Sequence, residues 1–88
     1  MSATYDYVIA VKLLQPPRSV DHHYTARVTY LVRELGRLVE EVDPAVCGII
    51  EVWGRTPDEA RHKLERRVEH WIAREIAETE GVWLYEVA

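Results

Sequence analysis

The sequence contains a single cysteine and no phenylalanine among its 88 residues. Because Cys47 stands alone, the chain can form neither an internal disulfide nor a zinc site built from cysteines. The N-terminal residues lack the charged segment and apolar run of a secretory signal peptide. Stretches free of charge, such as residues 7–11, are far shorter than the roughly 18 residues of a membrane-spanning helix. We therefore expect a cytoplasmic protein that makes no membrane contact.

Neither sign of charge is in large excess. The sequence has 15 Asp and Glu against 11 Lys and Arg, which gives a net charge of −4 with neutral histidines. No basic arm or acidic tail is present, so bulk electrostatic attraction to nucleic acid is not expected. Hydrophobic residues at 48% and charged residues at 30% are typical of a folded globular chain. At this length we expect one α+β domain over residues 1–88.

Two stretches are apolar without a helical period, which predicts strands. Residues 5–14 (YDYVIAVKLL) are rich in Val, Ile and Tyr, and the two prolines at 16–17 end the stretch. Residues 47–53 (CGIIEVW) form the second apolar stretch, which follows a turn at 43–44. Between these two, the charged residues 37–43 predict a short strand at a sheet edge, where charge is favoured.

The stretch from Val20 to Leu35 fits two interpretations. At about 100° per residue its apolar side chains fall on one stripe, which favours a first helix. The alternation over residues 24–32 fits a strand in part, but Leu31 and Leu35 break it. Gly36 suits the C-terminal cap of a helix, because such a cap wants a residue that tolerates a positive φ.

A second helix is the clearest element. Thr56 is its predicted N-cap, Pro57 occupies the first helical position, and Glu59 completes a capping box. The apolar side chains at helical spacing are those of Ala60, Leu64, Val68, Trp71, Ile72 and Ile76. Gly81 predicts the end of this helix, and residues 82–87 (VWLYEV) predict a last strand.

The predicted order β-α-β-β-α-β is that of a ferredoxin-like sandwich, an antiparallel sheet with two helices on one face. The alternative is a βαβαβ chain in which one long first helix continues to Asp43. In the sandwich the second sheet face is uncovered, and aromatic residues of three strands are candidates to line it: Tyr5, Tyr7, Trp53, Trp83 and Tyr85. A large apolar face on a small protein predicts dimerisation through the sheet.

Residues that carry chemistry do not converge in the sequence. Residues 21–23 (DHH) are adjacent, whereas metal ligands on a helix need a spacing of three or four to share a face. His62 and His70 are eight positions apart, and Cys47 is interpreted as a small buried strand residue. No Gly-rich phosphate loop or hydrolase nucleophile motif is present. We therefore expect no catalytic residue, no metal and no cofactor.

One surface feature of the second helix suggests a partner. A basic stripe on its solvent side, at helical spacing, comprises Lys63, Arg66, Arg67, His70 and Arg74. Such a stripe can contact phosphate groups or an acidic partner surface. Glu59 and Glu78 lie four positions from either end of the stripe, which predicts ion pairs within the helix and a solvated face. The five basic residues are nevertheless the candidate partner-binding residues.

The segment from Gly54 to Ile72 resembles one found in HicB-like antitoxins. The resemblance rests on Gly54-Arg55-Thr56-Pro57-Asp58-Glu59-Ala60 followed by Leu64, Val68 and Trp71-Ile72. In that family the segment joins a strand to a helix, follows a hairpin and pairs with a sheet in a partly open αβ sandwich. The resemblance implies a dimer that masks a toxin. The family has a strand where the stretch from Val20 predicts a helix here.

Together these features predict a non-enzymatic, homodimeric binding module that acts through protein–protein contacts, like an antitoxin or an inhibitor. Two alternatives stay open. One is a small enzyme with an active site between protomers, and the other is a nucleic-acid-binding protein that uses the basic stripe. The net negative charge and the lack of basic loops disfavour nucleic acid as a partner.

Overall fold

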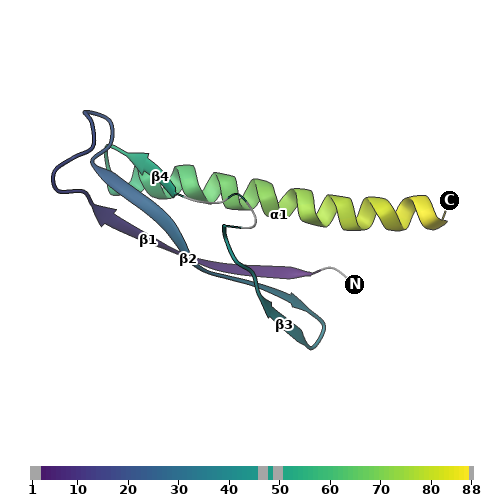
Figure 1. The fold of residues 1–88 in the computed structure, drawn as a ribbon. Helices are drawn as coiled ribbons and strands as arrows, with labels where there is room; N and C mark the ends of the chain where they lie inside the picture. Colours follow the sequence, from purple (N-terminus) through teal and green to yellow (C-terminus); the bar gives the residue numbers. More distant parts are fainter. Residues whose placement is uncertain (1–2, 46–47, 49–50, 88) are drawn as a thin grey trace.

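The computed structural model describes residues 3–45, 48 and 51–87, which form four strands followed by one long helix (Figure 1). The elements are β1 (Thr4–Leu13), β2 (Tyr24–Leu35), β3 (Leu38–Glu41), β4 (Glu51–Gly54) and α1 (Pro57–Val87). Within this described part, no helix has the length and apolar character that crossing a membrane would require.

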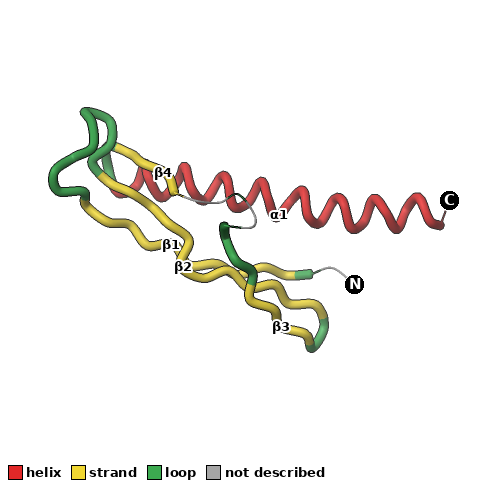
Figure 2. The backbone as a smooth tube through the Cα atoms, in the orientation of Figure 1, coloured by secondary structure: helices red, strands yellow, loops and turns green. Residues whose placement is uncertain are grey.

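Strand β2 is the centre of one antiparallel sheet (Figure 2). β1 pairs with β2 over its full length, from Thr4 opposite Glu34 to Leu13 opposite Tyr24. On the other side of β2, β4 pairs with the first part of the strand and β3 with the last part. β1 therefore forms one whole edge of the sheet, while two strands of 4 residues each share the other edge.

An irregularity in β2 changes which side chains face the helix. Val28 and Tyr30 pair with successive residues of β1, so Thr29 between them is an extra residue, a β-bulge. Beyond such a bulge every side chain of the strand moves to the opposite face. Leu31 consequently lies on the same face as Val28 and is fully buried. The break in alternation at Leu31 is thus the signature of a bulged strand.

The core lies between α1 and one face of the sheet (Figure 1). Ala60, Leu64 and Val68 recur every four residues along α1 and are fully buried, in one cluster with Ala26 of β2 and Val52 of β4. Half-buried side chains pack around this cluster: Tyr7, Ile9, Val11, Tyr24, Val28, Trp71 and Ile72. The apolar helix face predicted from the sequence is therefore confirmed along the part that contacts the sheet.

The start of α1 is fixed by two local contacts. The hydroxyl of Thr56 accepts a hydrogen bond from the backbone N–H of Glu59 at 3.1 Å, which confirms Thr56 as the N-cap. Gly54, at the end of β4, lies so close to the helix that a Cβ atom there would be 2.6 Å from the backbone N of Ala60. Only glycine permits this approach of strand and helix without displacement.

The predicted ferredoxin-like fold is wrong, because the described chain has four strands and one helix in place of βαββαβ. The first helix predicted over residues 20–35 is mostly strand β2, and the alternative long helix to Asp43 is wrong for the same reason. Gly36 has a φ of 62°, but it belongs to the tight turn between β2 and β3 rather than to a helix cap. Both settings need a residue that tolerates a positive φ, so Gly36 could not distinguish them.

The prediction for the C-terminal residues is also wrong. α1 continues through Gly81 to Val87, and residues 82–87 do not form a strand. A glycine inside a helix costs only about 1 kcal/mol relative to alanine, so it does not end a helix by itself. In Figure 1 this part of α1 extends past the sheet.

Three strand predictions are confirmed in full or in part. Residues 5–14 and 37–43 correspond to β1 and β3, which confirms both the long apolar strand and the short charged one. The strand predicted over residues 47–53 is confirmed for its last three residues, in β4. Cys47 lies outside the described residues, so its predicted burial remains a prediction.

Candidate functional site

The predicted basic stripe lies along the exposed side of α1. All five of its residues are exposed: Lys63, Arg66, Arg67, His70 and Arg74. The two ion pairs expected from helical spacing are present, with Lys63 Nζ 3.2 Å from a carboxylate oxygen of Glu59 and Arg74 3.7 Å from Glu78. At both ends, therefore, the stripe is neutralised within the helix.

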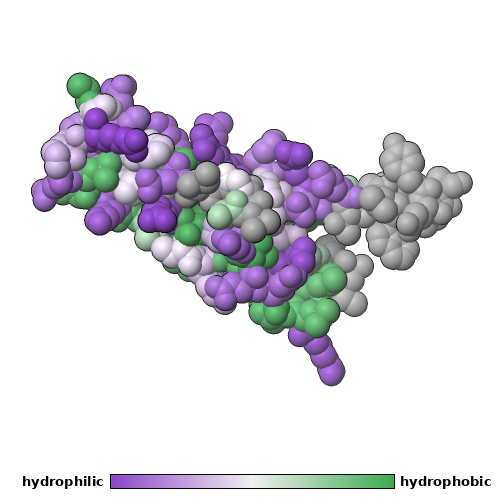
Figure 3. Space-filling model, viewed as in Figure 1, coloured by the Kyte–Doolittle hydropathy of each residue, from purple (hydrophilic) through white to green (hydrophobic). Residues whose placement is uncertain are grey.

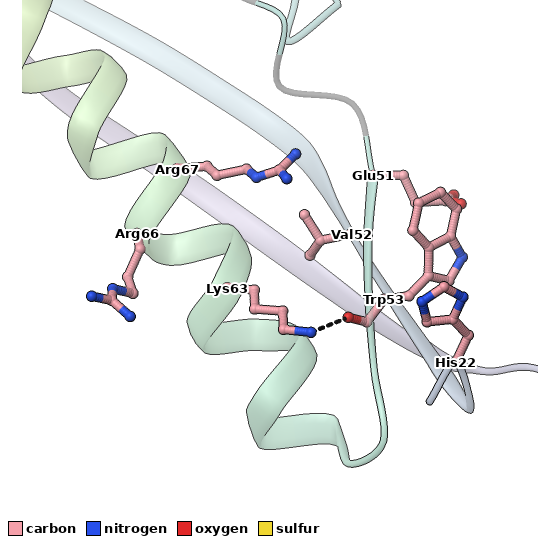
Figure 4. Close-up of a pocket in the computed structure, with 7 residues that line it drawn as sticks. All are labelled: His22, Glu51, Val52, Trp53, Lys63, Arg66 and Arg67. Atoms are coloured by element: carbon pink, nitrogen blue, oxygen red, sulfur yellow. Dashed lines mark hydrogen bonds between the residues drawn. The ribbon is translucent and has the colours of Figure 1, made fainter. Parts of the chain in front are cut away.

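A cleft of about 480 Å³ lies between α1 and β4, and it takes in part of the stripe (Figure 4). Its lining residues are His22, Glu51, Val52, Trp53, Lys63, Arg66 and Arg67. Lys63 Nζ donates a hydrogen bond to the Trp53 carbonyl at 3.1 Å. The side chain of Arg67 extends toward β4, whereas that of Arg66 points away from it (Figure 4). Neither arginine has an ion-pair partner among the described residues.

The aromatic side of β4 is already engaged within the chain. The rings of His22 and Trp53 stack with centroids 5.6 Å apart, and the Arg18 guanidinium lies 5.0 Å from the Trp53 ring centroid. Arg55 forms an ion pair with Asp21 at 2.8 Å, in the same region. Residues 18–22 are thus attached to β4 and to the residue that follows it by ring stacking, a cation–π contact and an ion pair.

Within the described residues, the acidic and histidine side chains are spread over the surface and do not gather at a metal site. Across the described ranges, no three His, Cys, Asp or Glu side chains gather closely enough to hold a metal ion. His62 lies 3.7 Å from Glu65 on the exposed side of α1, and His70 is exposed on the same helix.

A second cavity, of about 570 Å³, lies at the sheet face opposite to α1. It is lined by Ala10, Lys12, Leu14, Thr25, Arg27, Val28, Thr29 and Glu51. Lys12 pairs with Thr25 across the sheet, and Arg27 forms an ion pair with Glu51 at 3.6 Å. The wall of this cavity therefore carries both signs of charge.

Thr25, one of the residues that line this second cavity, carries a buried polar group. Thr25 is 5% exposed, and its buried hydroxyl has no hydrogen-bond partner among the described residues. A buried hydroxyl without a partner costs about 1–3 kcal/mol. Sequence reasoning missed this site because a helix would turn Thr25 and Arg27 about 200° apart, whereas a strand places them on one face. The signal that could have found it is the alternation over residues 24–28.

Apolar side chains are exposed on the same sheet face. Val8 pairs with Tyr30 across β1 and β2, and the two are 54% and 45% exposed. Val39 of β3 is 65% exposed on this face. Figure 3 shows apolar surface gathered over the β2–β3 hairpin, where Leu35 and Leu38 are exposed as well, at 44% and 72%. Tyr5 and Tyr7, two candidates for this face, instead face α1, where Tyr5 packs edge-on to Trp71 with ring centroids 5.7 Å apart.

Among the described side chains, three have displaced pKa values, and each has a structural cause. Partial burial, with Glu69 and Glu65 nearby, raises the pKa of Tyr7. The hydrogen bond from Lys63 lowers the pKa of Glu59, and the hydrogen bond to Glu40 raises that of Arg33. None of these three side chains lines either cavity. The values of Tyr7 and Arg33 therefore report contacts between elements of the fold, and that of Glu59 reports a contact within α1.

Comparisons with protein-family models, with curated proteins and with solved structures find no match to this chain.

Proposed function

We propose that this chain is a cytoplasmic, non-enzymatic, homodimeric binding module that recognises another protein through the sheet face opposite to α1. The observation that carries the proposal is the asymmetry of the sheet. Helix α1 packs on one face, at whose margins Leu13, Leu35 and Leu38 stay exposed, while the face without a helix exposes Val8, Tyr30 and Val39, each at least 45% exposed. Exposed apolar side chains grouped on one face of a small protein mark an interaction surface.

The cavity lined by Thr25 lies on the same face of the sheet and supports its assignment as the interaction surface. It places a buried hydroxyl without a partner beside Lys12 and the Arg27–Glu51 ion pair. A partner that inserts a polar group into this cavity would meet charges of both signs at its rim. Interfaces with an apolar centre and a polar rim are typical of protein partners.

The resemblance of residues 54–72 to HicB-like antitoxins supports a binding role of the antitoxin or inhibitor class. In that family the segment follows a hairpin and pairs with a sheet. Here β4 follows the β2–β3 hairpin in the sequence, pairs with β2 and leads directly into α1. The strand that the family has before this segment has its counterpart in β2.

The test is capture of partners from the native lysate with matched baits. Wild-type protein is compared with Tyr30→Glu, which places a charge on the exposed sheet face, and with Arg67→Gln/Arg74→Gln, which removes two charges of the basic stripe on α1. We expect a stoichiometric protein that binds the wild type and the arginine variant but not Tyr30→Glu. Its binding is then measured by calorimetry with the purified pair.

A partner that is retained by Tyr30→Glu and lost with the arginine variant contradicts the proposal. So does a captured species that nuclease releases, which would favour the nucleic-acid alternative and the basic stripe. Circular dichroism of each bait checks that it is folded. Sedimentation equilibrium at tens of micromolar should give about twice the monomer mass of 10.3 kDa, and a monomer at that concentration would contradict the dimer.

A further inference from the structure

We propose that two copies of this chain pair antiparallel through the free edge of β1, about a twofold axis at Ile9, so that their sheets join into one. This inference deepens the proposed function and rests on it for the dimeric state. It assigns the dimer contact to the sheet edge and leaves the exposed face available to a partner. The edge strand β1 has 10 residues, whereas β3 and β4 have 4 each, so β1 offers the longest ladder.

The contacts between β1 and β2 show which backbone groups of β1 are free. Leu14 donates its N–H to His23 of the β1–β2 connection, and the Val8 carbonyl accepts a hydrogen bond from the Thr29 hydroxyl of β2. Even-numbered residues of β1 therefore direct their backbone groups toward β2. Because these groups alternate along a strand, the odd-numbered residues from Tyr5 to Leu13 direct theirs away from the sheet. Another strand can pair with them.

The alternation restricts how a second copy can pair. In an antiparallel ladder outward-facing residues oppose outward-facing residues, so odd positions must oppose odd positions. The twofold axis must then pass through a residue, and Val8, Ile9 and Ala10 are the central choices. With the axis at Ile9, Tyr5 lies opposite Leu13 of the second copy, and the ladder covers β1 from residue 5 to residue 13.

Charge complementarity selects the axis at Ile9. β1 carries two charged side chains, Asp6 and Lys12, and both are exposed on the face opposite to α1. With the axis at Ile9, Asp6 lies opposite Lys12 of the second copy, and symmetry provides this ion pair twice. With the axis at Val8, Asp6 would oppose Ala10, and with the axis at Ala10 it would oppose Leu14. Opposite charges at directly paired positions stabilise a sheet, and like charges destabilise it.

The remaining side chains are also compatible with this register. Val8 lies opposite Ala10 of the second copy, on the exposed face. This pair brings the apolar patches around Val8 and Tyr30 of both copies to the centre of one joined surface. The two α1 helices lie together on the other face of the joined sheet. The dimer thus presents a single, doubled interaction surface.

The first test is charge reversal followed by sedimentation equilibrium. Asp6→Lys alone places like charges opposite each other twice in the dimer, and we expect the dissociation constant to rise about tenfold or more. Lys12→Asp alone should act similarly. Asp6→Lys/Lys12→Asp restores opposite charges and should return the dissociation constant to within about threefold of wild type. Glu34→Lys, an exposed charge reversal on β2, is the matched control and should have no effect.

The second test reads the register directly by disulfide formation, in a Cys47→Ser background so that only introduced thiols react. With the axis at Ile9, a mixture of Val8→Cys and Ala10→Cys proteins should form a disulfide between unlike chains. Each variant alone should stay reduced. The two copies of residue 8, or the two copies of residue 10, would then lie about 7–8 Å apart, which is too far for a disulfide. Val8→Cys alone would cross-link with the axis at Val8, and Ala10→Cys alone with the axis at Ala10.

The outcomes separate this inference from the proposed function. The wild type could be a dimer whose dissociation constant is unchanged by charge reversal, with no mixed disulfide formed. That result overturns edge pairing, while the proposed dimeric module stands. A disulfide in either single variant overturns the axis at Ile9. A wild-type monomer at tens of micromolar overturns both proposals. Rescue by the double charge reversal, with the mixed disulfide, supports pairing through β1 and no other edge.

Discussion

Replacing Thr25 by valine should stabilise the protein, which is the reverse of most substitutions in a buried position. Threonine and valine have nearly the same shape, so the substitution leaves the packing of β2 intact. The Thr25 hydroxyl is buried without a hydrogen-bond partner among the described residues, and such a group costs about 1–3 kcal/mol. Since the side chain is only 5% exposed, little water contact offsets this cost. We therefore expect a gain of about 1–2 kcal/mol in the free energy of unfolding.

A gain of 1 kcal/mol in a domain of this size corresponds to about 4–8 °C in Tm. The assay is urea unfolding at one fixed protein concentration, because the stability of a dimer depends on concentration. Thr29→Val is the matched control: its hydroxyl is exposed and donates to the Val8 carbonyl at 3.3 Å. This control should stay within about 0.5 kcal/mol of wild type.

The reasoning fails if Thr25→Val destabilises the protein by about 1 kcal/mol or more while Thr29→Val is neutral. That result would mean that the Thr25 hydroxyl is satisfied in the folded protein and that the cavity has no unmet polar group. If the variant is stabilised as expected, its capture of the partner should be unchanged, because the buried hydroxyl is out of reach of a group in the cavity.

Three further predictions concern the helix start and the strand β1. Thr56→Ala should cost about 1 kcal/mol through loss of the N-cap, measured by the urea midpoint, with an unchanged dimer mass. Gly54→Ala should cost more, about 1–3 kcal/mol by Tm, because its Cβ would lie 2.6 Å from the Ala60 backbone N; an unchanged Tm would contradict the close approach. The raised pKa of Tyr7 stabilises the folded protein fully below pH 10.0 and loses this effect as pH rises through that pKa, so Tyr7→Phe should flatten the alkaline decline in unfolding free energy.

The sequence predicted those parts of the fold in which one local signal had one structural meaning. Thr56, Pro57 and Glu59 together form a helix-start signal, and the long apolar strand before residue 16 has no competing period. Gly36 had two meanings, since a helix cap and a hairpin turn both use a positive φ. At Leu31 the β-bulge shifts the alternation of apolar side chains by one residue, and the shifted pattern fits the helical period.

The candidate site was harder to predict than the fold, because it depends on which residues pair across strands. The basic stripe was predicted correctly as exposed, and its end residues pair within the helix as the spacing indicates. The cleft beside Arg67 and the cavity at Thr25 could not be predicted, because both are made by residues far apart in the sequence. If the residues of β2 are predicted to form a helix, nothing places Lys12 beside Thr25; the pairing of β1 with β2 does.

The contact between Lys63 and the Trp53 carbonyl has a consequence for how far assembly can proceed. A protein with two equally receptive sheet edges can add copies without end, whereas one receptive edge allows a symmetric pair that closes on itself. The Trp53 carbonyl on the edge strand β4 is occupied by the Lys63 ammonium, and the neighbouring edge strand β3 carries Glu40 and Glu41. The exposed charge of Lys63 and the acidic side chains of β3 discourage an incoming strand on that side. Lys63→Met should therefore open a second receptive edge and convert a closed dimer into a chain that grows with concentration.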